Sequence, residues 1–331
     1  MNKPLARQDL RGPLLRSVSR SFYLSLRVLP APLRDPLSLA YLLARATDTI
    51  ADTPEAPVAV RIEALQQLAG AIQDTVEKDK VAQLEESFAS LQSNPAERAL
   101  IKQLRALLDW LNELGTADRD EVRGVLARIN RGQRLDLEKF GNGSDIRALA
   151  NAGELDEYTY LVAGCVGEFW TRLCFAHVKN FTERSESEMR DAGVRYGQGL
   201  QLINILRDAG DDLRHGRCYL PADELHSLGL TAAEILRAPS RAMPVVEKWR
   251  ERAEDGVKAG IDYACAIRNR RVRLATVLPA LIGARTLTLL REAGSEAFTR
   301  RVKVSRGEVR KMIVASTLGS SRSLRARLQQ F

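Results

Sequence analysis

The stretch LAYLLARATDTIADT, residues 39–53, joins an apolar helical pattern to two acidic residues, Asp48 and Asp52. Apolar residues spaced three and four apart predict a helix with one buried face. Residues four apart in a helix stack on the same side, so the two carboxylates point the same way and repel each other by about 0.2–0.5 kcal/mol. A helix suited to a core therefore carries a charge pair that a cation would stabilise.

A second pair with the same spacing, Asp208 and Asp212, lies in LQLINILRDAGDDLRHGRCYLP, residues 200–221. Asn204 extends the same helical face by one turn, and the pair again follows an apolar run. We expect the two pairs to lie on two helices that face each other across a cavity. A single such pair would be interpreted more simply as a solvated helix face.

The residue types around both pairs favour a metal and a phosphorylated ligand. Carboxylate oxygens suit Mg²⁺, which is commonly shared between one or two carboxylates and the phosphates of a substrate. Arg45 and Arg207 flank the pairs, and the guanidinium fork matches phosphate oxygens. The sequence therefore predicts a magnesium site that binds phosphate groups.

Composition indicates an all-α protein. The chain has 331 residues, of which 45% are hydrophobic and only 5% aromatic, and none of its 12 prolines lies between Ala96 and Leu220. This length is ample for a buried core. We see no linker or repeat, so residues 1–331 are expected to form one helical domain with flexible ends at about 1–12 and 319–331.

A helix beginning at Pro95 shows the helical pattern most clearly. Asn94 is expected to cap it and Glu97 to act as the reciprocal capping residue. Apolar residues then recur with the spacing of a buried stripe, at Leu100, Leu104, Leu107, Leu108 and Leu111.

The net charge of +8 and the pI near 9.5 indicate attraction to an anionic partner: nucleic acid, an acidic membrane surface or a phosphorylated substrate. No basic recognition helix or basic patch with interleaved aromatics supports nucleic acid. The four cysteines form no C-x-x-C pair, which argues against a zinc site. No apolar run of about 18 residues and no signal-peptide core is evident, so a reduced cytoplasmic protein is expected.

Four blocks together resemble the squalene and phytoene synthases. They are SRSFYLSLRVLP (19–30), YLLARATDTIAD (41–52), YTYLVAGCVG (158–167) and QLINILRDAGDDLRHGRCYLP (201–221). They occur in the order found in that family, and together they are far more specific than any one alone. The resemblance implies the all-α isoprenoid synthase fold, in which helices surround a central apolar cavity.

The same resemblance implies head-to-head condensation of two farnesyl diphosphate molecules. It assigns Mg²⁺ binding to Asp48, Asp52, Asp208 and Asp212. It also places a set of polar side chains around the diphosphates: Ser19, Arg20, Tyr41, Arg45, Asn204 and Arg207. Tyr41, Arg45 and Arg207 are expected to take part in catalysis.

Tyr158 matches the tyrosine to which the family assigns proton transfer or cation stabilisation. Leu161 stands where many squalene synthases have another tyrosine, so either Tyr158 or Tyr160 is expected to lie nearer the reacting carbons. The small residues of VAGCVG, such as Gly164 and Gly167, allow close approach either of a ligand or of a neighbouring helix.

The segment RVKVSRGEVRKMI, residues 301–313, resembles a block of squalene synthases that binds the phosphates of NADPH. Lys303 and Arg306, with Asn204 and Arg207, are then cofactor residues. A solvated helix face or a membrane-surface contact is the alternative. We expect NADPH-dependent formation of squalene by a cytoplasmic enzyme in peripheral contact with the membrane, with no obligate protein partner and no nucleic acid. A phytoene, dehydrosqualene or hydroxysqualene synthase without the reductive step is the alternative activity.

Overall fold

The computed structural model describes residues 6–19, 22–141 and 145–318. Helices dominate, and the strands among these residues are two short parallel ones, β1 (Arg147–Ala148) and β2 (Arg217–Cys218). The all-α prediction is confirmed. The chain forms two compact units, Met1–Gly141 and Asn142–Phe331, each described by itself below, and its organisation as one domain stays a prediction.

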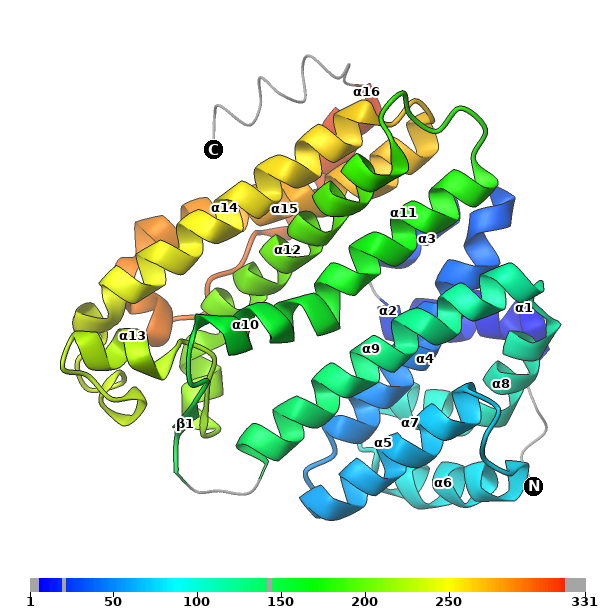
Figure 1. Cartoon of the computed structure of the whole chain (residues 1–331), viewed down its shortest axis with the longest axis horizontal. Helices are drawn as coiled ribbons and strands as arrows, with labels where there is room; N and C mark the ends of the chain where they lie inside the picture. The colour runs from blue at the N-terminus through cyan, green and yellow to red at the C-terminus, as the bar shows by residue number, and fades with distance from the viewer. Residues whose placement is uncertain (1–5, 20–21, 142–144, 319–331) are drawn as a thin grey trace. The chain divides into compact units, whose positions relative to one another are not determined.

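Every secondary-structure element among the described residues of unit 1 is a helix (Figure 1). Its elements are α1 (Arg7–Asp9), η1 (Leu10–Leu14), α2 (Leu15–Ser19), α3 (Phe22–Val28), α4 (Ala31–Ala51), α5 (Val58–Ile72), α6 (Lys78–Leu91), α7 (Pro95–Ile101), α8 (Leu104–Glu113) and α9 (Thr116–Phe140). Residues 7–12, expected to be part of a flexible end, lie in helical turns, and Leu10 is buried. The other expected flexible stretches, residues 1–5 and 319–331, lie outside the described residues.

Helix α4 is the centre of unit 1 and packs against α5, α8 and α9. Five of its apolar side chains recur three or four residues apart and are completely buried: Leu39, Leu42, Leu43, Ala46 and Ile50. Burying each large one contributes about 1.5–3 kcal/mol, before the entropic cost of ordering the chain. This buried face fixes the orientation of the opposite, polar face of α4.

The helix that begins at Pro95 ends at Ile101, after about two turns. Asn94 caps α7 as expected, with its side chain accepting from the Ala96 amide. A new helix, α8, begins at Leu104. There, the buried carboxylate of Glu85 in α6 accepts hydrogen bonds from the Arg105 backbone amide at 2.9 Å and from the Arg105 Nε at 2.8 Å. The side chain of α6 thus satisfies an amide at the start of α8, and the apolar pattern continues into a new helix.

Unit 2 contains the second aspartate pair. Its elements are β1, α10 (Ala152–Thr159), η2 (Tyr160–Gly164), α11 (Cys165–His177), α12 (Glu186–Arg214), β2, α13 (Ala222–Ser227), η3 (Ala232–Glu234), η4 (Pro239–Ala242), α14 (Met243–Ala266), α15 (Arg270–Ala293), η5 (Gly294–Phe298) and α16 (Arg306–Leu318). Helix α12 is the longest, and a complete capping box between Ser185 and Glu188 starts it. It packs against α11, α14 and α15 (Figure 1).

Glycine contacts bring α12 very close to its neighbours. A Cβ on Gly167 of α11 would lie 2.0 Å from the Gly193 carbonyl oxygen, and one on Gly256 of α14 would lie 2.6 Å from the Gly199 Cα. Any side chain at these positions would force the helices apart. The interpretation of Gly167 as a helix-packing residue is therefore confirmed.

One stretch, Arg270–Phe298, has the length and mean hydropathy of a membrane-spanning helix, contrary to the expectation that no run was long enough. In its most apolar window, 61% of the residues are buried inside unit 2. This burial is typical of a core helix, since α15 packs against α12, α14 and α16.

Candidate functional site

Helix α4 presents a continuous polar stripe made of Tyr41, Arg45, Asp48 and Asp52. Arg45 occupies its middle and makes two short ion pairs, to Asp48 Oδ2 at 2.5 Å and to Glu97 Oε1 of α7 at 2.6 Å. Glu97 thus bonds to Arg45 instead of acting as the expected reciprocal cap. The remaining nitrogen, Arg45 Nε, is buried without a hydrogen-bond partner among the described residues.

Both aspartate pairs lie at the C-terminal ends of long helices. Asp48 is in the last turn of α4 and Asp52 is its C-cap, with no basic residue in that turn. Asp208 and Asp212 occupy the last two turns of α12. The C-terminus of a helix carries a partial negative charge, which disfavours acidic side chains. Two carboxylates at this end form an unfavourable arrangement that a bound cation would reverse.

The pKa of Asp48 reflects this crowding of negative charge. Burial among neighbouring groups raises it to about 6, with repulsion by Asp52 as the second cause and Arg45 opposing both. The side chain of Asp48 is 41% exposed, and Asp52 is the charged group that repels its carboxylate most strongly. A divalent ion would remove this repulsion and favour the ionised form.

The other predicted residues of unit 1 lie beside the stripe or outside the described residues. Tyr41 donates a hydrogen bond to the Val18 carbonyl of α2 at 3.2 Å, and Ser19, the next residue, is buried with its hydroxyl donating to the Leu15 carbonyl. The structure therefore brings Ser19 close to Tyr41. Arg20 lies outside the described residues.

In unit 2, the face of α12 with Asn204, Asp208 and Asp212 is polar. Arg207 donates to both oxygens of Asp208, at 2.9 and 2.5 Å. Asp212 lies 3.6 Å from Arg217 Nε, and Asn204 donates to the Gln201 side chain at 3.3 Å. Each aspartate pair thus has an arginine bonded to its first carboxylate. That the two pairs face one another stays a prediction.

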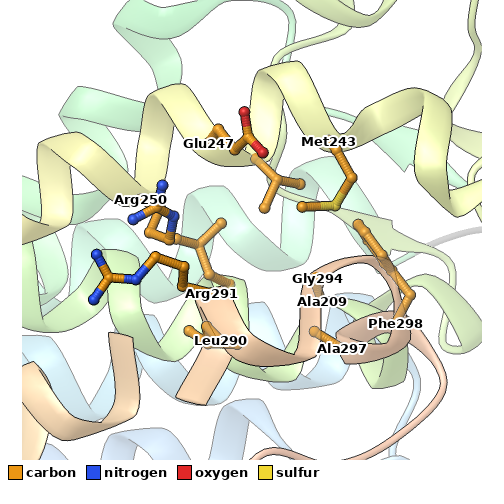
Figure 2. Close-up of a pocket in the computed structure, with 11 residues that line it drawn as sticks. Ala209, Met243, Glu247, Arg250, Leu290, Arg291, Gly294, Ala297 and Phe298 are labelled. Carbon is orange, nitrogen blue, oxygen red and sulfur yellow. The ribbon is translucent and has the colours of Figure 1, made fainter. Parts of the chain in front are cut away.

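The opposite face of α12 borders a hollow of about 570 Å³, including open solvent at its mouth. Leu206 and Ala209 form its α12 wall, while Figure 2 shows Arg250 and Arg291 at one end and Met243 near Phe298 at the other. The hollow is lined by residues of α12, α14, α15 and η5.

Gly210, between Asp208 and Asp212 in sequence, sets how closely η5 approaches α12. A Cβ at this position would lie 2.0 Å from the Phe298 carbonyl oxygen. Arg214 NH1 donates to the same oxygen at 3.1 Å. The end of α12 is thereby held against η5 by a backbone contact and a hydrogen bond.

Gly210→Ala is expected to reduce both stability and Mg²⁺-dependent activity. The added methyl group has no room, so α12 or η5 must shift at a cost of about 1–3 kcal/mol. Urea unfolding of both proteins measures this. Gly124→Ala in the middle of α9 is the matched control, because its nearest neighbour is 4.0 Å away; it should stabilise by about 0.5–1 kcal/mol. Equal effects of the two substitutions would contradict the packing argument.

The two candidate tyrosines have different surroundings. The Tyr160 hydroxyl lies 3.2 Å from Glu168 Oε2, a buried carboxylate that also accepts from Arg172 at 2.8 Å. Tyr158 stacks on Tyr219 with ring centroids 4.9 Å apart. The segment Tyr160–Gly164 forms a π-helical turn, a feature found frequently at functional sites. Because Tyr160 is held by Glu168, Tyr158 is the better candidate for contact with substrate.

The predicted cofactor residues of the C-terminal segment are exposed. Lys303 lies between the buried Val302 and Val304, and Arg306 is the first residue of α16. The pKa of Asp211 is lowered chiefly by its hydrogen bond with Arg214, and the positive charge of the adjacent Arg301 adds to this effect. The segment therefore lies near the C-terminal end of α12.

Within the described residues, no group of three or more His, Cys, Asp or Glu side chains is arranged around one point as a metal site. Each pair offers two hard carboxylates. This is the donor set that suits Mg²⁺ when substrate phosphates and water complete the coordination. The repulsion between Asp48 and Asp52 fits the same interpretation.

Four residues with a place near these features were missed by sequence reasoning. Glu97 reaches Arg45 from 52 residues away, and no local pattern could have indicated that contact. Gln201 lies one turn before Asn204, so its position on the same face was visible in the sequence. Tyr219 lies in the same stretch of sequence as Asp208 and Asp212, but nothing in the sequence indicated its stack on Tyr158. Val166 of α11 is 38% exposed and gives unit 2 an apolar surface residue.

The described residues thus form a helical fold with two helix-end aspartate pairs, each joined to an arginine. The family model described as squalene/phytoene synthase matches residues 15–308. The chain belongs to the squalene/phytoene synthase family, and the family resemblance noted in the sequence is confirmed. Membership of this family indicates that the protein is a prenyltransferase of the kind that condenses prenyl diphosphates head to head.

Among curated relatives, a bifunctional lycopene cyclase/phytoene synthase of Phaeosphaeria nodorum is 32% identical over 310 residues, covering 91% of this chain and 48% of that protein. The chain thus spans about half the length of that relative. A presqualene diphosphate synthase of Rhodopseudomonas palustris is 28% identical, covering 90% of this chain and 92% of that one. The solved structure of TcSQS with the ligand BPH1237 has a TM-score of 0.76 at 22% identity, covering 98% of this chain and 91% of that chain. It establishes the isoprenoid synthase fold.

Proposed function

We propose that the protein condenses two farnesyl diphosphates to presqualene diphosphate and then reduces this product to squalene with NADPH. The observation that carries the proposal is the pair of aspartates at the C-terminal end of both α4 and α12, each with its arginine. The relative named presqualene diphosphate synthase, which this chain matches over nearly its whole length, supports the substrate class.

The residues present fit bound Mg²⁺, which when present neutralises the negative charge of a leaving diphosphate. Asp48 and Asp52 would hold it on α4, and Asp208 and Asp212 on α12. Arg45 and Arg207 are already fixed by carboxylates, so their guanidinium groups stabilise developing negative charge without reorganising.

After the diphosphate departs, the allylic cation must be protected from water and stabilised by neighbouring groups. Val166 provides apolar surface on α11, and Tyr158, held by its stack on Tyr219, would place a ring or hydroxyl near the reacting carbons. The phosphates of NADPH match the charges of Lys303 and Arg306, with Asn204 and Arg207 as further contacts. The proximity of Arg301 to Asp211 supports a cofactor position near the end of α12.

Product analysis tests the proposal. Purified protein is incubated with farnesyl diphosphate and Mg²⁺, with and without NADPH, and the extracted lipids are identified by mass spectrometry. Squalene formed only with NADPH, and presqualene diphosphate without it, is the expected result. The same product with and without NADPH would overturn the reductive step.

A phytoene synthase is the second candidate, because the Phaeosphaeria nodorum relative is named as one. Parallel incubations with geranylgeranyl diphosphate distinguish it. A C40 hydrocarbon formed without reductant, at a higher kcat/KM than any C30 product, would favour this candidate. Dehydrosqualene or hydroxysqualene would be recognised as a C30 product that does not require NADPH.

Binding of Mg²⁺ is expected to weaken in acid because Asp48 must lose a proton to coordinate the ion. With a pKa of about 6 in the metal-free protein, the carboxyl is ionised above pH 6 and progressively protonated below it. The α4 affinity should therefore fall by about tenfold per pH unit below pH 6. Calorimetric titration with Mg²⁺ alone avoids the titration of diphosphate itself. An affinity that is constant from pH 5 to about pH 7 would contradict this assignment.

The expected contact with a membrane also remains a proposal. The substrate and product of this reaction class are apolar chains, which partition into lipid, so an enzyme at the membrane surface would meet them at higher concentration. We expect a cytoplasmic enzyme in peripheral contact with lipid. No obligate protein partner is inferred.

A further inference from the structure

The positive charge of the chain is concentrated in its last 32 residues. Residues 300–331 contain nine Lys and Arg against one acidic residue, Glu308. Of the 50 basic and 42 acidic residues in the whole chain, 41 of each remain in residues 1–299, which are therefore neutral overall. The net charge of +8 belongs entirely to the C-terminal segment.

Six of these nine basic residues lie among the described residues, and the structure exposes all six to solvent. Buried and exposed residues alternate from Arg301 to Val304: Val302 and Val304 are buried, and Arg301 and Lys303 are exposed. In α16, Val309, Met312 and Ile313 pack against the core of unit 2. We call the exposed basic residues of this segment the terminal basic surface; they are Arg300, Arg301, Lys303, Arg306, Arg310 and Lys311.

Glu308 does not offset these charges. Its carboxylate accepts from Arg285 Nε of α15 at 2.8 Å and from the Ser305 amide at 3.0 Å. These bonds lower its pKa to about 2, so it stays ionised and is already balanced by Arg285. Arg300 lies 3.4 Å from Glu296, but both side chains are about 70% exposed, and such a pair contributes little. The terminal basic surface therefore retains most of its positive charge.

We propose that the terminal basic surface binds the headgroups of anionic phospholipids and docks the protein on a membrane. Six basic residues within twelve positions resemble in density the segments that bind acidic lipid surfaces. A dinucleotide offers only a few phosphates and would occupy only part of this surface. A nucleic-acid site would be expected to stack bases on aromatic rings, and residues 299–330 contain no Phe, Tyr, Trp or His.

Co-sedimentation with lipid vesicles tests the proposal on the full chain. The variant replaces Arg300, Arg301, Arg310 and Lys311 with Gln. Lys303 and Arg306 are left intact, so the proposed cofactor contacts are tested separately. A matched variant replaces four exposed basic residues elsewhere in unit 2 with Gln: Lys179, Arg184, Arg195 and Arg237.

The wild-type protein should bind vesicles of phosphatidylglycerol mixed with phosphatidylcholine, and not vesicles of phosphatidylcholine alone. Each basic residue near an anionic surface strengthens binding by about fivefold. The variant with four Gln substitutions should therefore bind several hundred times more weakly. The matched variant should stay close to the wild type. Raising salt from about 0.1 M to about 1 M should release the protein, because the Debye length falls from about 10 Å to about 3 Å.

Three results would overturn the proposal: no binding to anionic vesicles, equal loss of binding in both variants, or displacement of the bound protein by stoichiometric duplex DNA. Far-ultraviolet circular dichroism of both variants checks that they are folded. Product formation from farnesyl diphosphate in detergent, with and without NADPH, is measured in parallel. If the variant with four Gln substitutions loses only the NADPH-dependent step and still binds vesicles, the surface serves the cofactor and the docking proposal is wrong.

Discussion

Replacing Asp208 or Asp48 with Asn should lower kcat on the order of 10²–10³-fold while leaving the fold intact. The substitution keeps the side-chain shape and removes one negative charge at a helix C-terminus, so stability is expected to be unchanged or slightly higher. The activity loss follows from weaker Mg²⁺ binding and poorer neutralisation of the leaving diphosphate. Steady-state kinetics over a range of Mg²⁺ concentrations and urea unfolding measure the two effects.

Asp211→Asn is the matched control for Asp208. Asp211 lies on the same helix, but its side chain is 55% exposed and pairs with Arg214 at 2.7 Å. Losing an exposed ion pair should cost no more than about 1 kcal/mol and should not change kcat. If Asp211→Asn and Asp208→Asn reduce turnover equally, the assignment of the 208/212 face is wrong.

Arg45→Lys should reduce kcat/KM by about 10²-fold even though the positive charge is kept. Arg45 bridges Asp48 at 2.5 Å and Glu97 at 2.6 Å through different nitrogens of one planar fork. A lysine ammonium is a single point charge without this geometry, so it cannot hold both carboxylates and also face a diphosphate. Kinetics with saturating Mg²⁺ separate this effect from metal binding.

Arg34→Lys controls for the loss of an arginine from the same helix. Arg34 donates its Nε to the Leu29 carbonyl at 2.8 Å near the start of α4, far along the helix from the aspartates. Only a modest loss of stability is expected there, without a change in kcat/KM. Full activity of Arg45→Lys would show that charge alone suffices and that the bridging geometry has no catalytic role.

The helical architecture was predictable because its signals are local. The apolar spacing in residues 39–53 identified the buried face of α4, and Asn94 with Pro95 identified the start of α7. The interruption before α8 was not predictable, because Glu85 of α6 forms the bonds that start the new helix. A tertiary contact of this kind leaves no mark on the spacing of apolar residues.

The candidate site was also predictable where its signals are local and not where it depends on tertiary contacts. The i, i+4 spacing placed each aspartate pair on one helical face, and the flanking arginines were identified with them. The Arg45–Glu97 bridge and the Tyr158–Tyr219 stack depend on chain segments that are distant in sequence. The location of the net charge was readable from the sequence, but showing that six basic side chains are exposed required the packing of α16.

The most direct test of the central claim is calorimetric binding of farnesyl thiodiphosphate, an analogue that is cleaved very slowly, to the wild type, Asp48→Asn and Asp208→Asn. If both aspartate pairs hold Mg²⁺ for substrate diphosphates, binding should require Mg²⁺ and should weaken by about tenfold or more in each variant. Binding that is independent of Mg²⁺, or unchanged in either variant, would contradict the account.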